Sequence, residues 1–504
     1  MLKLFVIRKF FPLLMIFVAV LVLYYPSFSV YFSQDDFFEF KVSLTDGSLG
    51  QFVNLFGFPS FSERGYAFYR PIFREGLHNL YYSAFGLNVF PMRLLSFLVH
   101  FINISLVYFL IEKVTKKKAV AFITAFFFAI STPNVAVLNY LAGGLEVQGA
   151  TMFSLLSLTL FSKYLDHKNS KDKTFSFVFF ILALASHELA IITPLLLVGL
   201  IFVKEPTKKF FVLAARELWI YAIALAVFLY LDAVKIGFLQ KEKQYQAVFS
   251  LKSIINSLSW YTVWALGLPE MLIDFVRPGL KLNPSLMRYW GEYYRIIFAS
   301  FFVSWLVIVI STLITIFKNH KFLNDKKFWF FTLWFFVGVT PVVFLPLHKS
   351  THYLSLALPG FWGAIWYFIF SLQNKTNRIF KPVIVVLLVS LSAMSIASAI
   401  LGNNLYWAAA RGRLAEKLIN DVAVKYPNLP PGSVIYFTND SSYPFIANEW
   451  GSSSKQAAFI LNNEDALQLY FKDLTLRVFY EDLGGVPNSL QREGVLPIVA
   501  RITP

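Results

Sequence analysis

The sequence predicts an all-α polytopic membrane protein of about eleven transmembrane helices, followed by a small α/β extracytoplasmic C-terminal domain. Composition is the first observation: 57% of the 504 residues are hydrophobic and only 15% are charged, against about 25% charged in a soluble globular protein. The second is that the apolar residues form runs of about 17–25, which is the length of a membrane-spanning helix. Such runs must be helical because lipid offers no partner for backbone N–H and C=O groups.

Positive charge predicts the orientation of these helices. The net charge is +16, and 21 of the 45 lysines and arginines lie in six short segments beside apolar runs. Cytoplasmic loops carry such an excess, so the charge indicates topology and gives no reason to expect nucleic acid as a partner. The six segments are residues 3–9, 113–118, 163–173, 204–209, 318–327 and 375–381.

Eleven spans bring all six basic segments to one side, with the N-terminus in the cytoplasm and the C-terminus outside. Residues 251–276 are apolar but contain Gly267, Pro269, Glu270 and Asp274. Counting them as a span would invert every later basic loop, so we expect an interfacial or re-entrant helix outside. The expected spans are 10–27, 89–111, 119–133, 145–163, 174–187, 189–203, 210–232, 293–317, 328–346, 352–372 and 382–401.

The chain therefore divides into a transmembrane domain (1–401) and an extracytoplasmic domain (402–504). The first has large outer segments at 28–88 and 233–292. The second contains an amphipathic stretch, a turn, a strand-like run and two further apolar runs, at 405–424, 427–432, 433–438, 474–480 and 495–502.

Cysteine is absent, so disulfides, thiolate metal sites and a cysteine nucleophile are excluded. Together with the predicted topology, this absence fits a protein of the bacterial inner (plasma) membrane. The first apolar run follows a basic N-terminus and imitates a signal peptide. We expect an uncleaved first span instead, because the residues directly after it are candidates for function.

Acidic residues follow the first span directly, as Asp35 and Asp36. A carboxylate there can take a proton from an attacking hydroxyl as a general base, and paired acids raise each other's pKa toward neutrality. The alternative is that one of them only N-caps a helix that begins at Phe37.

Arg70 follows in the motif Tyr69-Arg70-Pro71. Its guanidinium offers a rigid fork that suits a phosphate. The alternative is an exposed amphipathic helix with Pro71 at its first position.

Two further groups lie at outer turns. His187 and Glu188 stand between spans five and six, where they can orient a phosphate, bind a metal or hold the first outer segment. Capping of a short helical hairpin is the alternative. Glu146 opens span four after the turn expected at Gly143-Gly144, and an acid is also favourable at a helix N-terminus.

The last group is His348, Lys349, His352 and Tyr353, between spans nine and ten. It brings basic groups to the outer leaflet, where a lipid phosphate would lie. The alternative is anchoring at the interface by Tyr and Lys. Two histidines four residues apart can also bind a metal, but no firm third ligand accompanies them. We therefore assign no metal site and leave a divalent metal ion as an open alternative.

These motifs, in this order, resemble those of the GT-C membrane glycosyltransferases. The acidic pair, the Tyr-Arg-Pro motif and the His-Glu turn before span six are most similar to the dolichyl-phosphate-mannose-dependent branch. That branch includes the protein O-mannosyltransferase-like proteins that carry tetratricopeptide repeats in animals. Residues 132–146 are similar to an outer loop of the branch, with Thr132 in place of its His and Gly144 in place of its Arg. His352-Tyr353 is similar to its Arg-Tyr pair. The resemblance covers roughly residues 1–400, and residues 402–504 show no tetratricopeptide pattern.

The resemblance implies an inverting, mannosyltransferase-like enzyme with a polyprenyl-phosphate-linked sugar donor and with Asp35 as general base. The acceptor is a protein, a glycan or a lipid on the outer face of the membrane. The chemistry of the residues agrees, because a leaving phosphate needs cations such as Arg70, Lys349 and His352. Two alternatives remain. A lipid or solute transporter or flippase would carry charges near span centres and matching broken helices, and neither is apparent. The other is a non-catalytic GT-C-like protein.

Overall fold

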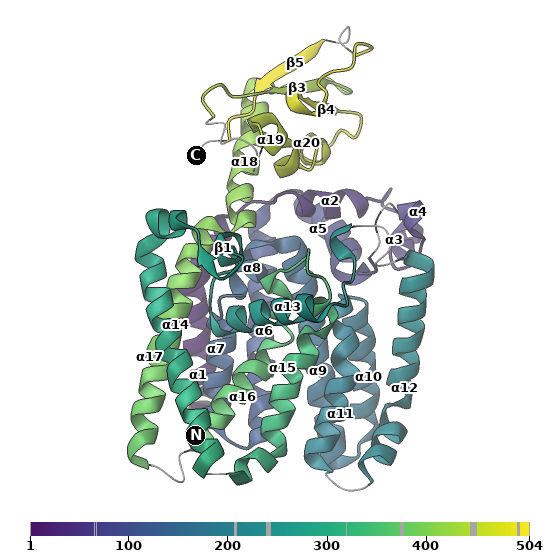
Figure 1. Ribbon diagram of the computed structural model, residues 1–504. Helices are drawn as coiled ribbons and strands as arrows, with labels where there is room; N and C mark the ends of the chain where they lie inside the picture. Colours follow the sequence, from purple (N-terminus) through teal and green to yellow (C-terminus); the bar gives the residue numbers. More distant parts are fainter. Residues whose placement is uncertain are drawn as a thin grey trace.

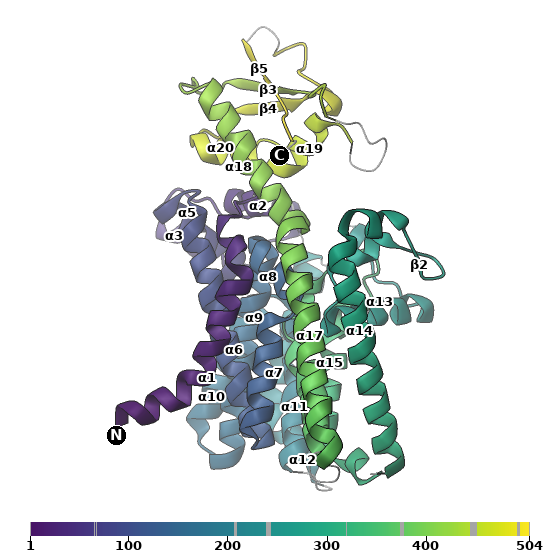
Figure 2. The same cartoon turned by 90° about the vertical axis from the view of Figure 1, so that its left-hand side faces the viewer.

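Long helices in a bundle form most of the molecule in the computed structural model, and a small α/β part stands on one end of the bundle (Figure 1). The two chain termini lie at opposite ends of the molecule in both views (Figures 1 and 2). The structure describes residues 2–64, 66, 68–205, 209–237, 243–318, 320–372, 377–443, 451–490 and 494–502.

Each predicted span coincides largely with one α-helix, which confirms the all-α polytopic bundle. Seven of these helices are long and apolar enough to cross a membrane: α1, α6, α9, α12, α14, α15 and α17. The other four have 12 to 15 residues. The bounds are α1 Leu2–Tyr24, α6 Val89–Thr115, α7 Lys118–Ile130, α9 Leu141–His167, α10 Ser170–Leu184, α11 Thr193–Lys204, α12 Phe210–Leu231, α14 Pro284–Lys318, α15 Lys326–Val343, α16 Leu358–Ser371 and α17 Asn377–Leu405.

Basic segments from different parts of the sequence meet at the end of the bundle that lies away from the α/β part (Figure 1). Asp166, near the end of α9, lies in the segment 163–173 and connects it to two others. Its carboxylate lies 3.1 Å from Nζ of Lys113 and also pairs with Lys204. The charge asymmetry of the sequence is thus an asymmetry of the folded molecule.

Short helices build the two outer segments. The first contains α2 Asp35–Val42, α3 Leu49–Asn54, α4 Phe61–Arg64, the π-helical segment η2 Pro71–Leu77 and α5 His78–Phe85. The second contains α13 Leu251–Leu266, η6 Glu270–Phe275 and a hairpin of β1 Val276–Arg277 and β2 Lys281–Leu282. Helix α13 lies across the long helices in both views and not parallel to them (Figures 1 and 2).

The chain ends in a three-stranded parallel sheet with helices, which confirms the small α/β part. Strand β3 Val434–Thr438 lies between β4 Arg477–Tyr480 and β5 Val495–Val499. Three helices accompany the sheet: α18 Trp407–Lys425, α19 Ser453–Leu461 and α20 Asp465–Phe471. Each strand lies within an apolar run that the sequence singled out. Only Tyr406 separates α17 from α18, so the last long helix continues upward into the α/β part (Figure 2).

The α/β part and the first outer segment share one hydrophobic core. Phe32, Phe37 and Phe40 are fully buried in the same cluster as Leu418 and Ile435. Polar contacts reinforce this packing, because the Tyr82 hydroxyl donates to the backbone carbonyl of Leu469 at 2.7 Å. The C-terminal residues thus cover the turn that carries the predicted base.

Candidate functional site

Helix α2 begins at Asp35, two residues before the start expected for the capping alternative. The residue at the cap is Gln34, whose side chain makes no capping hydrogen bond. The two carboxylates therefore do not cap a helix that begins at Phe37, because Asp35 and Asp36 both lie inside the first turn of α2. Their side chains instead reach two different neighbours.

Asp36 is a structural tie. Its side chain is 1% exposed and accepts two backbone hydrogen bonds, from Ser33 N–H at 2.9 Å and from Ala142 N–H at 2.8 Å. These bonds join the α2 turn to the start of α9. Burial raises the pKa of Asp36 to about 6, which the two backbone donors and Arg93 partly offset.

Asp35 is partly exposed, and its Oδ2 accepts a hydrogen bond from the Tyr140 hydroxyl at 2.6 Å. Burial and then the charge of Asp35 raise the pKa of Tyr140 well above its usual value. The hydroxyl therefore keeps its proton and holds one carboxylate oxygen in place. Of the two acids, Asp35 is the one that a substrate can reach.

Arg93 connects the backbone before Asp35 to the backbone before Tyr140. It is fully buried and donates to the carbonyl of Val30 at 2.8 and 3.0 Å, and to those of Leu138 at 2.6 Å and Asn139 at 3.1 Å. Val30 precedes the α2 turn, and Asn139 precedes Tyr140. Arg93 is not among the residues that the sequence predicts for the site, although a lone arginine inside an apolar run was a signal for it.

Arg70 lies at the centre of a buried ion network. Its Nε donates to both carboxylate oxygens of Glu188, at 2.9 and 3.1 Å, and its Nη1 donates to Glu146. The π-helical segment η2 does begin at Pro71, as the alternative expected. That segment is not an exposed amphipathic helix, however, because Arg70 and Arg74 are 7% and 6% exposed.

The network continues away from Arg70. Arg74 Nε lies 3.0 Å from Glu146 and 3.4 Å from Glu39, whose other oxygen lies 3.4 Å from His78 Nε2. Burial lowers the pKa of His78 to about 4, so the ring is neutral near pH 7. The sequence showed Glu39 and His78 beside the candidate motifs but gave no reason to pair them.

Glu146 is fully buried in the second turn of α9. The turn expected at Gly143-Gly144 is wrong, because both glycines lie inside this helix. A Cβ on Gly144 would lie 2.1 Å from the carbonyl oxygen of Val137. The glycine therefore permits a close approach of the α9 backbone to the backbone at Val137.

His187 caps the 3-10 helix η3 Glu188–Ile192, since Leu189 N–H donates to its Nδ1 at 3.1 Å. The capping alternative is therefore correct for this residue. Nδ1 is an acceptor, so the proton of the neutral ring is on Nε2. Nε2 is buried and has no hydrogen-bond partner within the described ranges.

The segment His348–Tyr353 is held by its own hydrogen bonds. His348 Nε2 lies 2.7 Å from the Tyr353 hydroxyl, and His352 Nδ1 lies 2.8 Å from Ser350 Oγ. Burial lowers the pKa of His348 to about 4 and that of His352 well below its usual value, which favours neutral rings. Lys349 is half-buried and donates to the Pro346 carbonyl at 2.7 Å.

Aromatic contacts join the Asp35 turn to the His187 turn in one layer. The Tyr140 ring lies 5.7 Å from the His352 ring, and the Tyr353 ring lies 4.0 Å from His352 and 5.9 Å from His187. The structure thus brings four segments of the sequence together at one end of the helix bundle.

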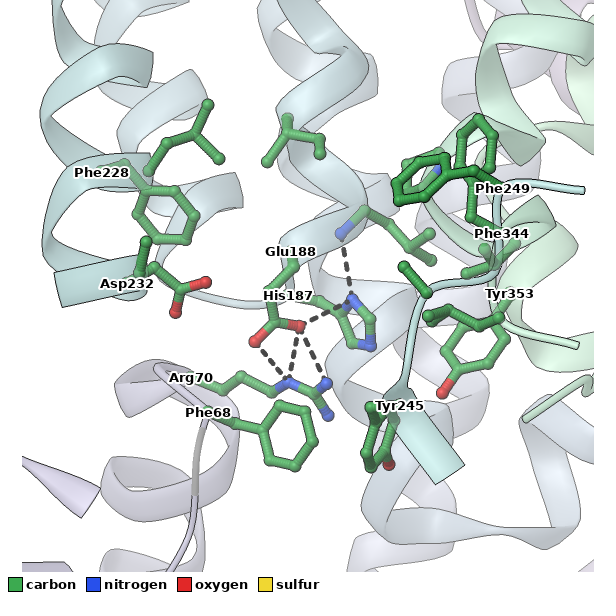
Figure 3. Close-up of a pocket in the computed structure, with 18 residues that line it drawn as sticks. Phe68, Arg70, His187, Glu188, Phe228, Asp232, Tyr245, Phe249, Phe344 and Tyr353 are labelled. Carbon is green, nitrogen blue, oxygen red and sulfur yellow. Dashed lines mark hydrogen bonds and ion pairs between the residues drawn. The ribbon is translucent and has the colours of Figure 1, made fainter. Parts of the chain in front are cut away.

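A cavity of about 350 Å³ opens beside this layer (Figure 3). Polar groups of Arg70, His187, Glu188, Asp232 and Tyr353 lie around one part of it, as the labelled side chains show. Most of the remaining wall is apolar and comes from α12, from the end of α15 with the two residues after it, and from the segment before α13: Phe228, Leu229, Phe249, Val342, Phe344 and Leu345. A cavity of this kind fits a ligand with a long apolar chain and a small polar head.

Metal ligation was left open by the sequence. Within the ranges that the structure describes, no three His, Asp or Glu side chains lie close enough to hold a metal ion. The two histidines at 348 and 352 are engaged by Tyr353 and Ser350 as described above.

Comparison with known proteins gives likeness at the level of structure. No protein-family model and no curated protein matches the chain. Among solved structures, the chain is similar to the archaeal oligosaccharyltransferase AglB from Archaeoglobus fulgidus in complex with an inhibitory peptide and a dolichol-phosphate. The TM-score is 0.42 and the identity 12%, over 90% of this chain and 64% of that chain. This chain thus spans less than two thirds of the length of AglB, and a likeness of this degree carries no argument about activity.

Proposed function

We propose that this protein is an inverting glycosyltransferase of the GT-C type. It moves a sugar from a polyprenyl-phosphate carrier to an acceptor at the outer face of the membrane, and Asp35 is the general base. One observation carries the proposal: a partly exposed carboxylate, fixed by the Tyr140 hydroxyl at 2.6 Å, shares a layer of contacts with residues of a largely apolar cavity that has polar groups at one side.

The reaction needs one proton transfer and one displacement. The acceptor hydroxyl donates to the oxygen of Asp35 that Tyr140 does not hold, and its own oxygen attacks the anomeric carbon. The bond from that carbon to the phosphate oxygen breaks as the new glycosidic bond forms, and the proton passes to Asp35. Attack from the face opposite the phosphate inverts the anomeric centre. The second product is polyprenyl phosphate.

The cavity beside Arg70 is the site we propose for the donor. Its apolar wall of phenylalanines and aliphatic side chains suits an isoprenoid chain. At the polar side, the N–H at Nε2 of His187 and the hydroxyl of Tyr353 are donors for a phosphate, and Lys349 adds a positive charge to the segment that carries Tyr353. Arg70 already pairs with two carboxylates, those of Glu146 and Glu188. We therefore assign it to stabilising this side of the cavity, and its attraction for the phosphate is weaker because its charge is shared.

Orientation follows from the same proposal. The site lies at the end of the bundle that carries the α/β part, away from the basic segments (Figure 1). Since basic loops remain in the cytoplasm, the N-terminus is cytoplasmic and transfer takes place on the extracytoplasmic side. The bacterial inner membrane is the location we propose.

Asp35→Asn tests the function, because it keeps the shape of the side chain and removes its basicity. Purified protein is given radiolabelled polyprenyl-phosphate hexoses and a panel of protein, glycan and lipid acceptors. We expect transfer to fall by about 10²–10⁴, with donor binding retained and the protein normally inserted. A variant that keeps more than about a tenth of the normal rate would remove Asp35 as the base.

Asp46→Asn is the matched control. Asp46 lies in the same outer segment but is exposed, and it accepts a hydrogen bond only within its own turn, from Ser48 N–H at 2.8 Å. We expect it to transfer sugar at the normal rate. If the unaltered protein moves no sugar but carries the lipid across vesicles, the transporter alternative is correct.

A further inference from the structure

The turn that carries Asp35 is held from two sides by the C-terminal residues. Gln34 N–H donates to the backbone carbonyl of Ile460, at the end of α19, at 2.9 Å. The Gln34 side-chain oxygen accepts a hydrogen bond from the guanidinium of Arg411, in α18. Both tethers reach the same residue, and it stands directly before the candidate base.

Gln34 needs such tethers because its backbone is strained. Its φ is +49° and its ψ is −107°, a conformation that residues with a side chain rarely adopt. Strain of this kind persists only where the surrounding structure fixes it. The Ile460 carbonyl and Arg411 are contacts that oppose its release.

Helix α18 also packs closely against the same turn. A Cβ on Gly412 would lie 2.4 Å from the carbonyl oxygen of Tyr31, so the glycine allows the helix to approach. One turn earlier, the Trp407 ring lies 5.0 Å from the Tyr140 ring, and the Arg411 guanidinium lies 5.2 Å from the Trp407 ring centroid. Helix α18 thus contacts residues that precede Asp35. It also contacts Tyr140, which holds the Asp35 carboxylate.

We propose that Arg411 is a positioning residue for the base. Helices α18 and α19 keep Gln34 in its strained conformation, and this conformation directs the Asp35 carboxylate toward Tyr140 and the acceptor. The inference rests on the proposed function, and it makes the C-terminal α/β part a component of the catalytic turn.

Arg411→Met is the central experiment, in the full-length protein. We expect kcat to fall by about tenfold or more, as displaced catalytic groups commonly cause, with donor KM within about twofold of normal. Arg411→Lys keeps a donor for the Gln34 side chain, so it should restore part of kcat.

Arg413→Met is the matched control, since Arg413 lies on the same helix, is exposed and donates to the Asn404 carbonyl at 2.7 Å. It should leave kcat unchanged. Gln34→Ala removes the same contact from the other side, so kcat should fall there as well. Normal kcat in both Arg411→Met and Gln34→Ala would overturn the proposal.

Hydrogen exchange separates this inference from the proposed function. We expect faster amide exchange at residues 34–38 in Arg411→Met than in the unaltered protein or in Arg413→Met. If exchange rises but Asp35→Asn still transfers sugar, Arg411 does position the turn, but Asp35 is not the general base. If exchange is unchanged while Asp35→Asn is inactive, the base is correct and Arg411 does not position it.

Discussion

The turn at Asp35 and the network around Arg70 place charged groups in opposite situations. Asp35 is partly exposed, and the Tyr140 hydroxyl holds only its Oδ2. Arg70 is buried, and its guanidinium meets the carboxylates of Glu146 and Glu188. Both groups were equally suggestive in the sequence. A charge that the protein has already neutralised has little attraction left for a substrate, so the two regions should respond differently to mutation.

Removal of Arg70 should have the largest effect on folding. Arg70→Ala leaves Glu146 and Glu188 buried with fewer partners, and breaking a buried pair typically costs about 3–5 kcal/mol. Thermal unfolding in detergent measures this loss. Arg216→Ala is the control because Arg216 is exposed and its partner Glu217 keeps its contacts with Lys173 and Tyr164. Asp35→Asn should also unfold near the normal temperature. Normal stability in Arg70→Ala would mean that its primary role is to bind the donor phosphate.

Asp36 should give a smaller effect that depends on pH. Its pKa in the folded protein is about 6, above the usual 3.8, because of burial. The folded state therefore holds this proton more tightly than the unfolded state. The stabilisation is complete below pH about 4 and is lost as pH rises to about 6, with a size of about 3 kcal/mol.

Asp36→Asn provides the reference for this measurement because its side chain does not titrate. The unfolding free energy of the unaltered protein, minus that of the variant, should rise as pH falls from 7 to 4. A difference that is constant over this range would show that Asp36 ionises without penalty, as a group in contact with water does.

Tyr140→Phe should have the smallest effect of the three. It removes one hydrogen bond to a charged group and leaves the aromatic packing, so kcat should fall by about tenfold with stability almost unchanged. Steady-state transfer assays measure this loss. A loss as large as that of Asp35→Asn would indicate that the tyrosine itself takes part in the proton transfer.

The sequence predicted the bundle well because lipid leaves an apolar run little freedom. Each run of sufficient length became a helix at the expected position, including α10 and α11, which are too short to stand out by length. The strands were predictable as short apolar runs between polar segments. The pair Gly143-Gly144 was misinterpreted, since two adjacent glycines commonly form a turn and here allow close packing inside α9.

The site was predictable only in part. Position at outer span ends gathered Asp35, Arg70 and His187 correctly on one side, but spacing does not determine which charges pair. Arg411 gave no signal, because a cation on an amphipathic helix is ordinarily a solvated residue. Its contact with Gln34 depends on tertiary folding across 377 positions of sequence.

The nearly unbroken helix from α17 into α18 fixes the distance and the rotation between the bundle and the α/β part. The stretch Lys381–Lys425 has 45 residues, which is about 68 Å of helix at 1.5 Å per residue, roughly twice the thickness of a hydrocarbon layer. One residue added to α17 would turn everything beyond it by about 100° and swing Arg411 away from Gln34. We therefore expect the length of this helix to be conserved more strictly among related proteins than the identity of most residues along it. Surface loops elsewhere should vary more freely.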